Sequence, residues 1–282
     1  MARTVMFQGN ALTLVGRIAK VGMRASDFKV VSQEMRDVSL SDFKGRIKVI
    51  SSFPSLDTPV CDLQVKEFNK RASAFSQDVV VIGISKDLPF AQKRFCSEHN
   101  INNEPVLSDY KTSSFGINYG MLIKELNLLA RSVRIIDKND IVRYIQLAPE
   151  ITKPLNYDDA VTALDEVMKN PASAVKEELP SKCKPCEGIA APIPKAEIEK
   201  LAARNPSWEV IEGKKIVKEF KFKDFPEAKY FLDTISVIAE EQGHHPTLTL
   251  MYNKLKITLT TRAAGGLTEN DFIMAGIIDG ML

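Results

Sequence analysis

The sequence predicts an α/β domain, built on a mixed sheet with helices on both faces, followed by a smaller α+β domain. Strand-like and helix-like segments alternate through the first half of the chain and end with an antiparallel pair. Residues 169–194 interrupt this pattern with five prolines and two cysteines, which is typical of a linker. Short strands and helices with brief connections follow. We therefore place the two domains at residues 1–169 and 195–282, with a linker at 170–194.

The elements of the first domain follow from turn signals and apolar patterns. Residues 5–8 and 11–15 flank Gly9-Asn10, a pair typical of a tight hairpin turn. Residues 79–84 form an apolar run without polar alternation, as expected of a central strand covered on both faces. The other predicted strands are residues 28–31, 47–51, 133–136 and 141–147, and helices are predicted around Cys61, from Pro89 and at residues 157–168.

Cys61 closes the segment 53–61 between a predicted strand and a predicted helix. Apolar residues recur after it at steps of four and three, which places the cysteine in the first turn of an amphipathic helix. The unpaired backbone N–H groups and the dipole at such a position favour the thiolate, which is the nucleophilic form. Position alone nevertheless favours the simpler interpretation of a small buried apolar residue.

The neighbours of Cys61 change that balance. Pro54, Thr58 and Cys61 form the pattern Pro-x-x-x-Thr-x-x-Cys, which resembles the active-site loop of peroxiredoxins. The segment 85–96 resembles the resolving segment of the bacterial thiol peroxidases, and the likeness extends from residue 9 to residue 152. The resemblance implies a thioredoxin-like fold, a homodimer and an antioxidant peroxidase that reduces hydrogen peroxide and organic hydroperoxides. Thioredoxin or a similar reductant would recycle it, with no cofactor and no metal.

The same resemblance implies a role for each candidate residue of the peroxidase. Cys61 would attack the peroxide and become a sulfenic acid, and Cys96 would condense with it to an intramolecular disulfide. Thr58 would orient the peroxide, Pro54 would shield the sulfur from water, and Arg131 would supply directed donors. Without the resemblance, Arg131 would be interpreted as a surface residue at a strand edge and Cys96 as a packed helix residue.

The second domain contains clear helix-terminus signals. Asp224 and Gly243 are the residue types that cap the two ends of a helix, and residues 268–271 form a capping box for the last helix. Other predicted elements are a helix at residues 196–203, strands at 208–211 and 215–222, and two alternating strands that turn near residues 253–254.

His244 and His245 precede Pro246 at the end of the long predicted helix. As a bare pair, they are more often exposed side chains than metal ligands. Residues 208–209, 220–225, 244–246, 252–254 and 266–271, however, follow one another as in the pterin-4a-carbinolamine dehydratases, a resemblance that begins near residue 183. It implies a pterin substrate, 4a-hydroxytetrahydrobiopterin, from which an acid and a base remove water.

Arg262 stands where this family has a third histidine. An arginine binds or polarises a ligand but does not give up its proton at neutral pH. Two hypotheses therefore remain for the second domain: a dehydratase, or a non-catalytic dimerisation or pterin-sensing module.

Cys183 and Cys186 form a C-x-x-C motif in the predicted linker. The motif is open to three interpretations: an inert pair, a redox dithiol that passes electrons to the peroxidase disulfide, or half of a zinc site. The inert pair is favoured, and zinc is the weakest because no second pair lies nearby in the sequence.

Charge and hydropathy exclude several classes of function. The net charge of +2 is too small to favour nucleic acid or an anionic membrane as a partner. No apolar run approaches the length of a membrane span, and the N-terminus lacks the apolar core of a secretory signal. We therefore expect a cytoplasmic protein, and its four cysteines indicate chemistry or metal binding more readily than a disulfide framework.

Overall fold

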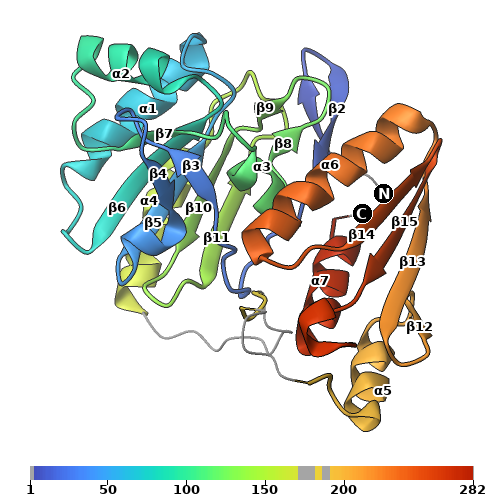
Figure 1. Cartoon of the computed structure of the whole chain (residues 1–282). Coiled ribbons are helices and arrows are strands. Elements are labelled where there is room, and N and C mark those ends of the chain that lie inside the picture. Colours follow the sequence, from blue (N-terminus) through green and yellow to red (C-terminus); the bar gives the residue numbers. More distant parts are fainter. Residues whose placement is uncertain (1–2, 171–181, 186–190, 282) are drawn as a thin grey trace. The chain divides into compact units, whose positions relative to one another are not determined.

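The chain forms two compact units, residues 1–177 and 178–282, in the computed structural model (Figure 1). The structure describes residues 3–170, 182–185 and 191–281. The division between the units falls inside the segment that the sequence predicts as a linker.

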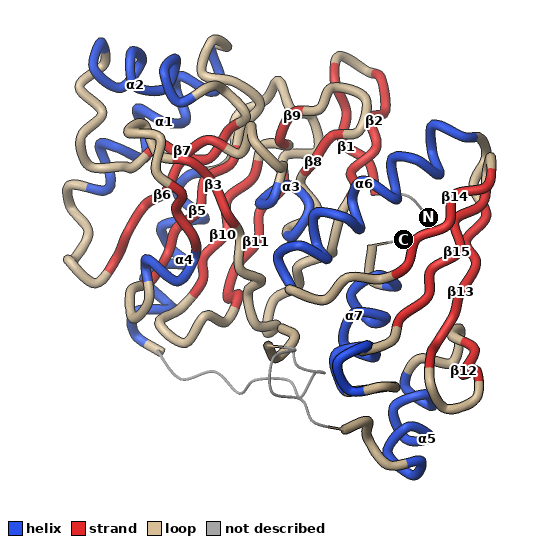
Figure 2. Tube along the Cα trace, viewed as in Figure 1, coloured by secondary structure: helices blue, strands red, loops and turns tan. Residues whose placement is uncertain are grey.

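The first unit is built on a seven-stranded mixed sheet with the order β11-β10-β5-β6-β7-β3-β4, which confirms the predicted α/β class (Figure 2). The strands β5, β6 and β7 are parallel, and the others are antiparallel to their neighbours. All seven residues of β6 are buried, as its continuous apolar run predicts. The strands are β3 (Lys29–Val31), β4 (Asp37–Ser39), β5 (Ile47–Ser52), β6 (Val79–Ser85), β7 (Val106–Ser108), β10 (Ser132–Ile136) and β11 (Val142–Leu147).

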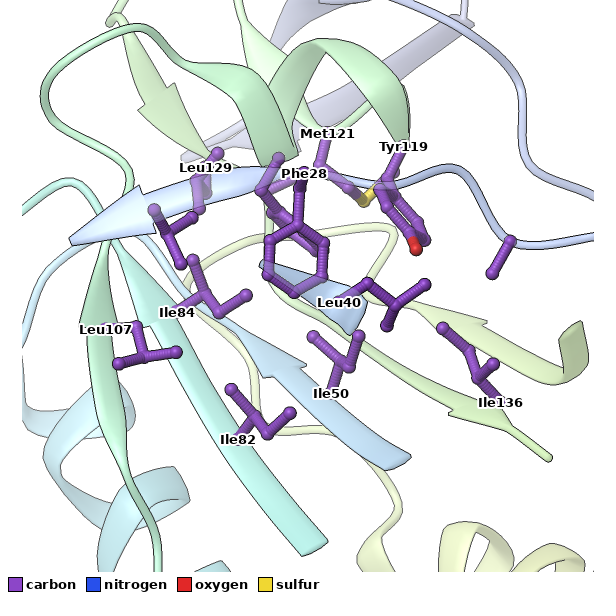
Figure 3. Close-up of a cluster of buried hydrophobic side chains, with 14 of the residues drawn as sticks. Phe28, Leu40, Ile50, Ile82, Ile84, Leu107, Tyr119, Met121, Leu129 and Ile136 are labelled. Carbon is purple, nitrogen blue, oxygen red and sulfur yellow. The ribbon is translucent and has the colours of Figure 1, made fainter. Parts of the chain in front are cut away.

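Both faces of this sheet are covered, because alternate residues of its strands point to opposite sides. On one face Val49, Val81 and Val133 pack against α1 (Pro59–Ala72) and α4 (Tyr157–Lys169). On the other face Ile50, Ile82 and Ile84 pack beneath Phe28, Tyr119 and Met121 (Figure 3). Two shorter helices, α2 (Pro89–Glu98) and α3 (Ser114–Asn118), complete the unit.

A second sheet, with the order β1-β2-β8-β9, was not predicted from the sequence. It consists of β1 (Arg3–Phe7), β2 (Asn10–Val15), β8 (Leu122–Ile123) and β9 (Leu128–Leu129). The predicted N-terminal hairpin is present, but its turn is Gln8-Gly9 rather than Gly9-Asn10. Asn10 pairs with Phe7, and Gln8 and Gly9 have φ angles of 49° and 84°, as a two-residue turn with two left-handed residues requires.

The second unit is built on a four-stranded antiparallel sheet, β12-β13-β15-β14, with helices on one face, which confirms the predicted α+β class. Leu255, Ile257 and Leu259 of β15 are buried, whereas Lys256 between them is exposed. The elements are α5 (Lys195–Arg204), β12 (Glu209–Ile211), β13 (Lys215–Lys221), α6 (Phe225–Gln242), β14 (Thr247–Met251), β15 (Lys254–Leu259) and α7 (Glu269–Asp279).

The predicted helix caps of the second unit are all present. The Asp224 side chain accepts a hydrogen bond from the Glu227 backbone, and Gly243 ends α6 with a φ of 61°. The backbone N–H of Thr268 donates to Asp271 at 2.8 Å in the predicted capping box. The β14–β15 turn is Tyr252-Asn253, one residue earlier than predicted, because Met251 pairs with Lys254.

Candidate functional site

Cys61 lies in the first turn of α1, directly beyond the C-terminal end of the central strand β5. Thr58 is the N-cap of this helix and Pro59 its first residue, so the loop 53–58 carries the chain from the sheet into the helix. The Cys61 side chain is fully buried. The sulfur therefore lies where the backbone N–H groups of a helix N-terminus favour an anion.

Arg131 directs its guanidinium at this sulfur. Its Nη2 donates to Cys61 Sγ at 3.1 Å, its Nη1 to Gln64 Oε1 at 2.6 Å, and its Nε to the Ile151 carbonyl at 3.0 Å. The side chain is 1% exposed, so Arg131 is not the surface residue that its position at a strand edge suggests. The hydrogen bonds to Gln64 and Ile151 leave this guanidinium little freedom to turn away from the sulfur.

Gln64 and Asp87 support the site, and sequence reasoning assigned a role to neither. Besides holding Arg131, Gln64 donates to Ser51 Oγ at 2.7 Å. Asp87 accepts from Ser55 Oγ at 2.7 Å and from the Leu56 backbone at 2.8 Å, which ties the Cys61 loop to the end of β6. Gln64 gives one signal in the sequence, because it is a polar residue beside the apolar stripe of a predicted buried helix.

Pro54 and Thr58 differ in their placement. Pro54 is buried, whereas Thr58 is exposed. The Thr58 hydroxyl donates to the Ser55 carbonyl at 3.1 Å. It makes no hydrogen bond to Cys61 among the described residues, so in this structure it braces the loop instead of contacting the sulfur.

Tyr157, the first residue of α4, brings a further hydroxyl to the site. Burial raises its pKa, and the charges of Arg131 and Cys61 also act on it. Within the described ranges this buried hydroxyl has no hydrogen-bond partner. The centroid of its ring lies 5.5 Å from that of Phe68, in an edge-to-face contact. Because the ring packs in this way, Tyr157 looks like an ordinary core residue in the sequence.

Cys96 lies on α2 and is 6% exposed. Gln33 Nε2 donates to its Sγ at 3.3 Å. Burial raises the pKa of this thiol to about 11; the Gln33 hydrogen bond opposes the shift, and Glu104 adds to it. Cys61 and Cys96 are both free thiols, and both belong to one apolar cluster with Phe53 and five further residues: Leu56, Val65, Phe95, Ile101 and Val106.

The second unit contains a cavity of about 330 Å³ at the end of α6. His244 is buried beside it and donates from Nε2 to Asp271 Oδ1 at 2.8 Å. The other carboxylate oxygen of Asp271 accepts from Thr261 Oγ1 at 2.9 Å. The cavity is lined by the four predicted residues, His244, His245, Pro246 and Arg262. The other lining residues are Gly243, Thr247, Thr258, Thr260, Thr261 and Ala263.

Two carboxylates beside this cavity were given no role at the histidines from the sequence: Glu240, and Asp271, which was predicted only as part of a capping box. His245 is exposed and pairs through Nε2 with Glu240 Oε2 at 3.0 Å. The buried carboxylate of Asp271 fixes the orientation of the His244 ring, whereas the exposed His245–Glu240 pair restrains its ring only weakly. The cavity thus combines one oriented imidazole and one exposed imidazole with the Arg262 guanidinium.

Cys183, predicted as a linker residue, is a buried residue of the second unit. Its backbone N–H donates to Gln242 Oε1 at 2.8 Å, and its Sγ lies 3.7 Å from the Asn270 carbonyl. Lys184 and Asn270 exchange two further hydrogen bonds, at 2.9 and 2.8 Å. The second cysteine of the C-x-x-C motif, Cys186, lies outside the described residues. Within the described part of the chain, no group of three or more His, Cys, Asp or Glu side chains is placed to hold a metal ion.

Comparison with known proteins gives a family to each unit. The Redoxin family matches residues 20–164, and the family "Pterin 4 alpha carbinolamine dehydratase" matches residues 191–281. A thiol peroxidase from Staphylococcus haemolyticus is 46% identical over 159 residues, which is 56% of this chain and 96% of that protein. A thiol peroxidase from Bacillus subtilis is 44% identical and covers 58% of this chain and 98% of its own length.

The chain belongs to the thiol peroxidases. A crystal structure of a peroxiredoxin-like protein from Aquifex aeolicus agrees with this assignment, with 45% identity and a TM-score of 0.56 over 59% of this chain and 98% of that one. The thiol peroxidase from Chromobacterium violaceum, at 21% identity and a TM-score of 0.54, shares the fold.

The thiol peroxidase domain is followed by a domain of the pterin dehydratase family. The two resemblances noted in the sequence, on either side of the predicted linker, are therefore confirmed. Among the helices in the described ranges, none combines the length and hydropathy that a bilayer span requires.

Proposed function

We propose that the thiol peroxidase domain reduces hydroperoxides through a Cys61 thiolate. The Cys61 sulfur attacks one peroxide oxygen, the O–O bond breaks, and the departing hydroxide or alkoxide takes up a proton while Cys61 becomes a sulfenic acid. The observation that carries the proposal is the 3.1 Å contact between Arg131 Nη2 and Cys61 Sγ. The same guanidinium favours the thiolate and offers donors to the charge that develops on the peroxide.

Cys96 then condenses with the sulfenic acid to an intramolecular disulfide, which a reductant of the thioredoxin type reduces. The membership of both thiols in one apolar cluster supports this pairing. Condensation with Cys96 also protects the sulfenic acid from further oxidation by a second peroxide molecule.

The test compares two variants in single-turnover and steady-state assays. Cys61→Ser abolishes peroxide consumption, because no other described thiol lies beside Arg131. Cys96→Ser consumes about one equivalent of peroxide and then stops, because disulfide formation needs both sulfurs. Sustained thioredoxin-dependent turnover by the Cys96→Ser variant would remove the resolving role from Cys96.

For the second domain we propose dehydration of a 4a-hydroxytetrahydropterin in the 330 Å³ cavity. The supporting observation is the buried His244–Asp271 pair, which holds one imidazole in a fixed orientation for proton exchange with the substrate. Arg262 would bind or polarise the pterin. His245, held by Glu240, would be the second proton-exchanging group.

A dehydration assay that compares the wild type with variants of the cavity residues distinguishes an enzyme from a binding module. We expect His244→Gln to lower turnover by about a hundredfold, the scale of one acid–base group. We expect Arg262→His, which supplies a third imidazole, to raise turnover. Tight pterin binding by the wild type without any dehydration would favour the pterin-sensing module instead.

A further inference from the structure

Arg262 has a defined place at the wall of the second-domain cavity. It begins the short helical turn Arg262–Ala264, which comes soon after β15. The Thr261 backbone N–H donates to the Gly266 carbonyl at 3.0 Å. The Gly265 N–H donates to the Arg262 carbonyl, also at 3.0 Å. Arg262 lines the cavity, and these backbone bonds fix the point at which its exposed side chain begins.

The same turn is tied to the buried His244–Asp271 pair. Thr261 Oγ1 donates to Asp271 Oδ2 at 2.9 Å, and the other carboxylate oxygen pairs with His244 Nε2 at 2.8 Å. Thr261 is 2% exposed and Asp271 is fully buried, so this connection is shielded from water. Arg262 therefore directly follows a residue of the network that orients His244. A ligand that reaches His244 from the cavity also lies beside Arg262.

The positive charge of Arg262 is not neutralised by any group in the described ranges. Its side chain has no hydrogen bond and no ion pair there. None of the ten residues that line the cavity is Asp or Glu. Of the two carboxylates beside the cavity, Asp271 is bonded to His244, and Glu240 pairs with His245. Because a guanidinium keeps its proton, the cavity wall carries a permanent positive charge.

Threonine hydroxyls supply further donors to the cavity. Thr247 and Thr258 are direct partners across the β14–β15 pair, and both line the cavity. The Thr260 hydroxyl donates to the Lys214 carbonyl at 2.8 Å and is therefore already engaged. A hydroxyl can donate to an anion or accept from a neutral group, so the threonines suit either kind of ligand. The guanidinium of Arg262 decides between them.

An anionic ligand group gains more from Arg262 than an uncharged one. A guanidinium presents its donors in a planar fork that matches the oxygens of a carboxylate or a phosphate. An uncharged carbonyl also accepts from it, but a hydrogen bond between ionised groups is roughly twice as strong. For one and the same pterin ring, a charged substituent should therefore give the tighter complex.

We propose that the cavity selects a pterin whose substituent carries an anionic group, a carboxylate or a phosphate, and that Arg262 determines this specificity. The proposal rests on the pterin dehydration proposed above for this domain. The ring lies towards His244 and His245, and the anionic group lies at Arg262. The side chain of 4a-hydroxytetrahydrobiopterin is uncharged, so that compound would be the weaker ligand.

The test measures the binding of oxidised pterins to the full-length protein by isothermal titration calorimetry. Pterin-6-carboxylate and the phosphate ester of 6-hydroxymethylpterin carry the two anionic groups, and 6-hydroxymethylpterin is the uncharged reference. We expect the better anionic ligand to bind about tenfold to a hundredfold more tightly than the reference. Arg262→Gln removes this advantage. Lys256→Gln, at an exposed lysine of β15 that does not line the cavity, retains it.

Salt tests the charge without any substitution. The advantage of the anionic ligand should shrink as the salt concentration rises, because salt screens an exposed charge such as that of Arg262. Equal binding of charged and uncharged pterins, or an advantage that survives in Arg262→Gln, overturns the proposal. Displacement of the anionic pterin by an equal concentration of inorganic phosphate also overturns it, since the site would then take any anion.

The failure of this proposal is distinguishable from the failure of the dehydratase. Oxidised pterins are ligands and not substrates, so their binding does not depend on turnover. If the preference for anionic pterins is found but no dehydration occurs, only the proposed activity is overturned. If dehydration occurs with equal binding of charged and uncharged pterins, only the specificity proposed for Arg262 is overturned.

Discussion

The direction of the Arg131 guanidinium is set by its three other acceptors. Gln64 Oε1 and the carbonyls of Val60 and Ile151 each take a hydrogen bond from it, which leaves Nη2 to face Cys61. A planar guanidinium can meet acceptors in several directions at once, whereas an ammonium group concentrates its charge at one atom. The geometry of the site therefore depends on an arginine and not only on a positive charge.

Arg131→Lys should lower the peroxide rate although the positive charge is retained. We expect a loss of about tenfold to a thousandfold in the second-order rate with hydrogen peroxide, the scale of one misplaced transition-state donor. Stopped-flow measurement of Cys61 oxidation checks this. Arg143→Lys, at a half-buried arginine that pairs with Asp137, is the control. A rate within about twofold of the wild type would contradict the role of Arg131.

At the level of single residues, the sequence predicted the proposed reacting groups better than the residues that hold them in place. Cys61 and Arg131 were predicted from a loop pattern and a resemblance, and the structure places them in contact. The contacts that Gln64, Tyr157 and Asp271 make at the two sites were not predicted. Their roles depend on which distant residue they face, and a helix pattern specifies which side of the helix a residue lies on without specifying its partner.

The connection between α2 and β7 contains a buried carboxyl group, that of Glu104, which has no hydrogen-bond partner among the described residues. Helix α2 was predicted from Pro89, and it carries Cys96 on its buried face. Residues 99–105 gave no periodic pattern, and Glu104 resembles a solvated loop residue in the sequence. Its burial follows from tertiary packing against Gly83, Phe53 and Val106.

The stability of the first domain should depend on pH through Glu104. The folded state binds this proton more tightly than the unfolded state, so the free energy of unfolding is highest below the ordinary carboxyl pKa. It falls as pH rises towards the raised pKa of the folded state, by up to about 1.4 kcal/mol per pH unit.

Urea titrations of the wild type and Glu104→Gln at several pH values measure this contribution. We expect a shallower fall of stability with pH in the variant. Glu98→Gln, at an exposed carboxylate of α2, should retain the wild-type slope. A variant slope equal to that of the wild type would show that Glu104 ionises as easily in the folded protein as in the unfolded chain.

Helix caps were the elements predicted most accurately, and tight turns were displaced by one residue. The capping residues Asp224, Gly243 and Thr268 bond to backbone groups only a few residues away, so the local sequence is enough to predict them. The turns at residues 8–9 and 252–253 depend on strand register, which cross-strand packing decides. The two-residue strands β8 and β9 are too short for any period to show.

For the whole molecule, the division into two units predicts two independent folding reactions. Each unit has its own sheet and its own buried apolar residues. Fragments 1–177 and 178–282 should therefore each melt cooperatively, and their transitions should together account for those of the full chain. Differential scanning calorimetry of the three proteins checks this. Broad, uncooperative melting of either fragment would mean that the units share a core.

The absence of a side chain at Gly83 has a consequence for how the sequence can vary. Glu104 Oε1 occupies the space that a methyl group at Gly83 would need. Alanine at position 83 would push the carboxyl group aside, so its effect should depend on which residue stands at position 104. The two positions are therefore expected to show epistasis: Gly83→Ala disturbs the packing of this region when Glu104 is present and is tolerated when a smaller side chain replaces it.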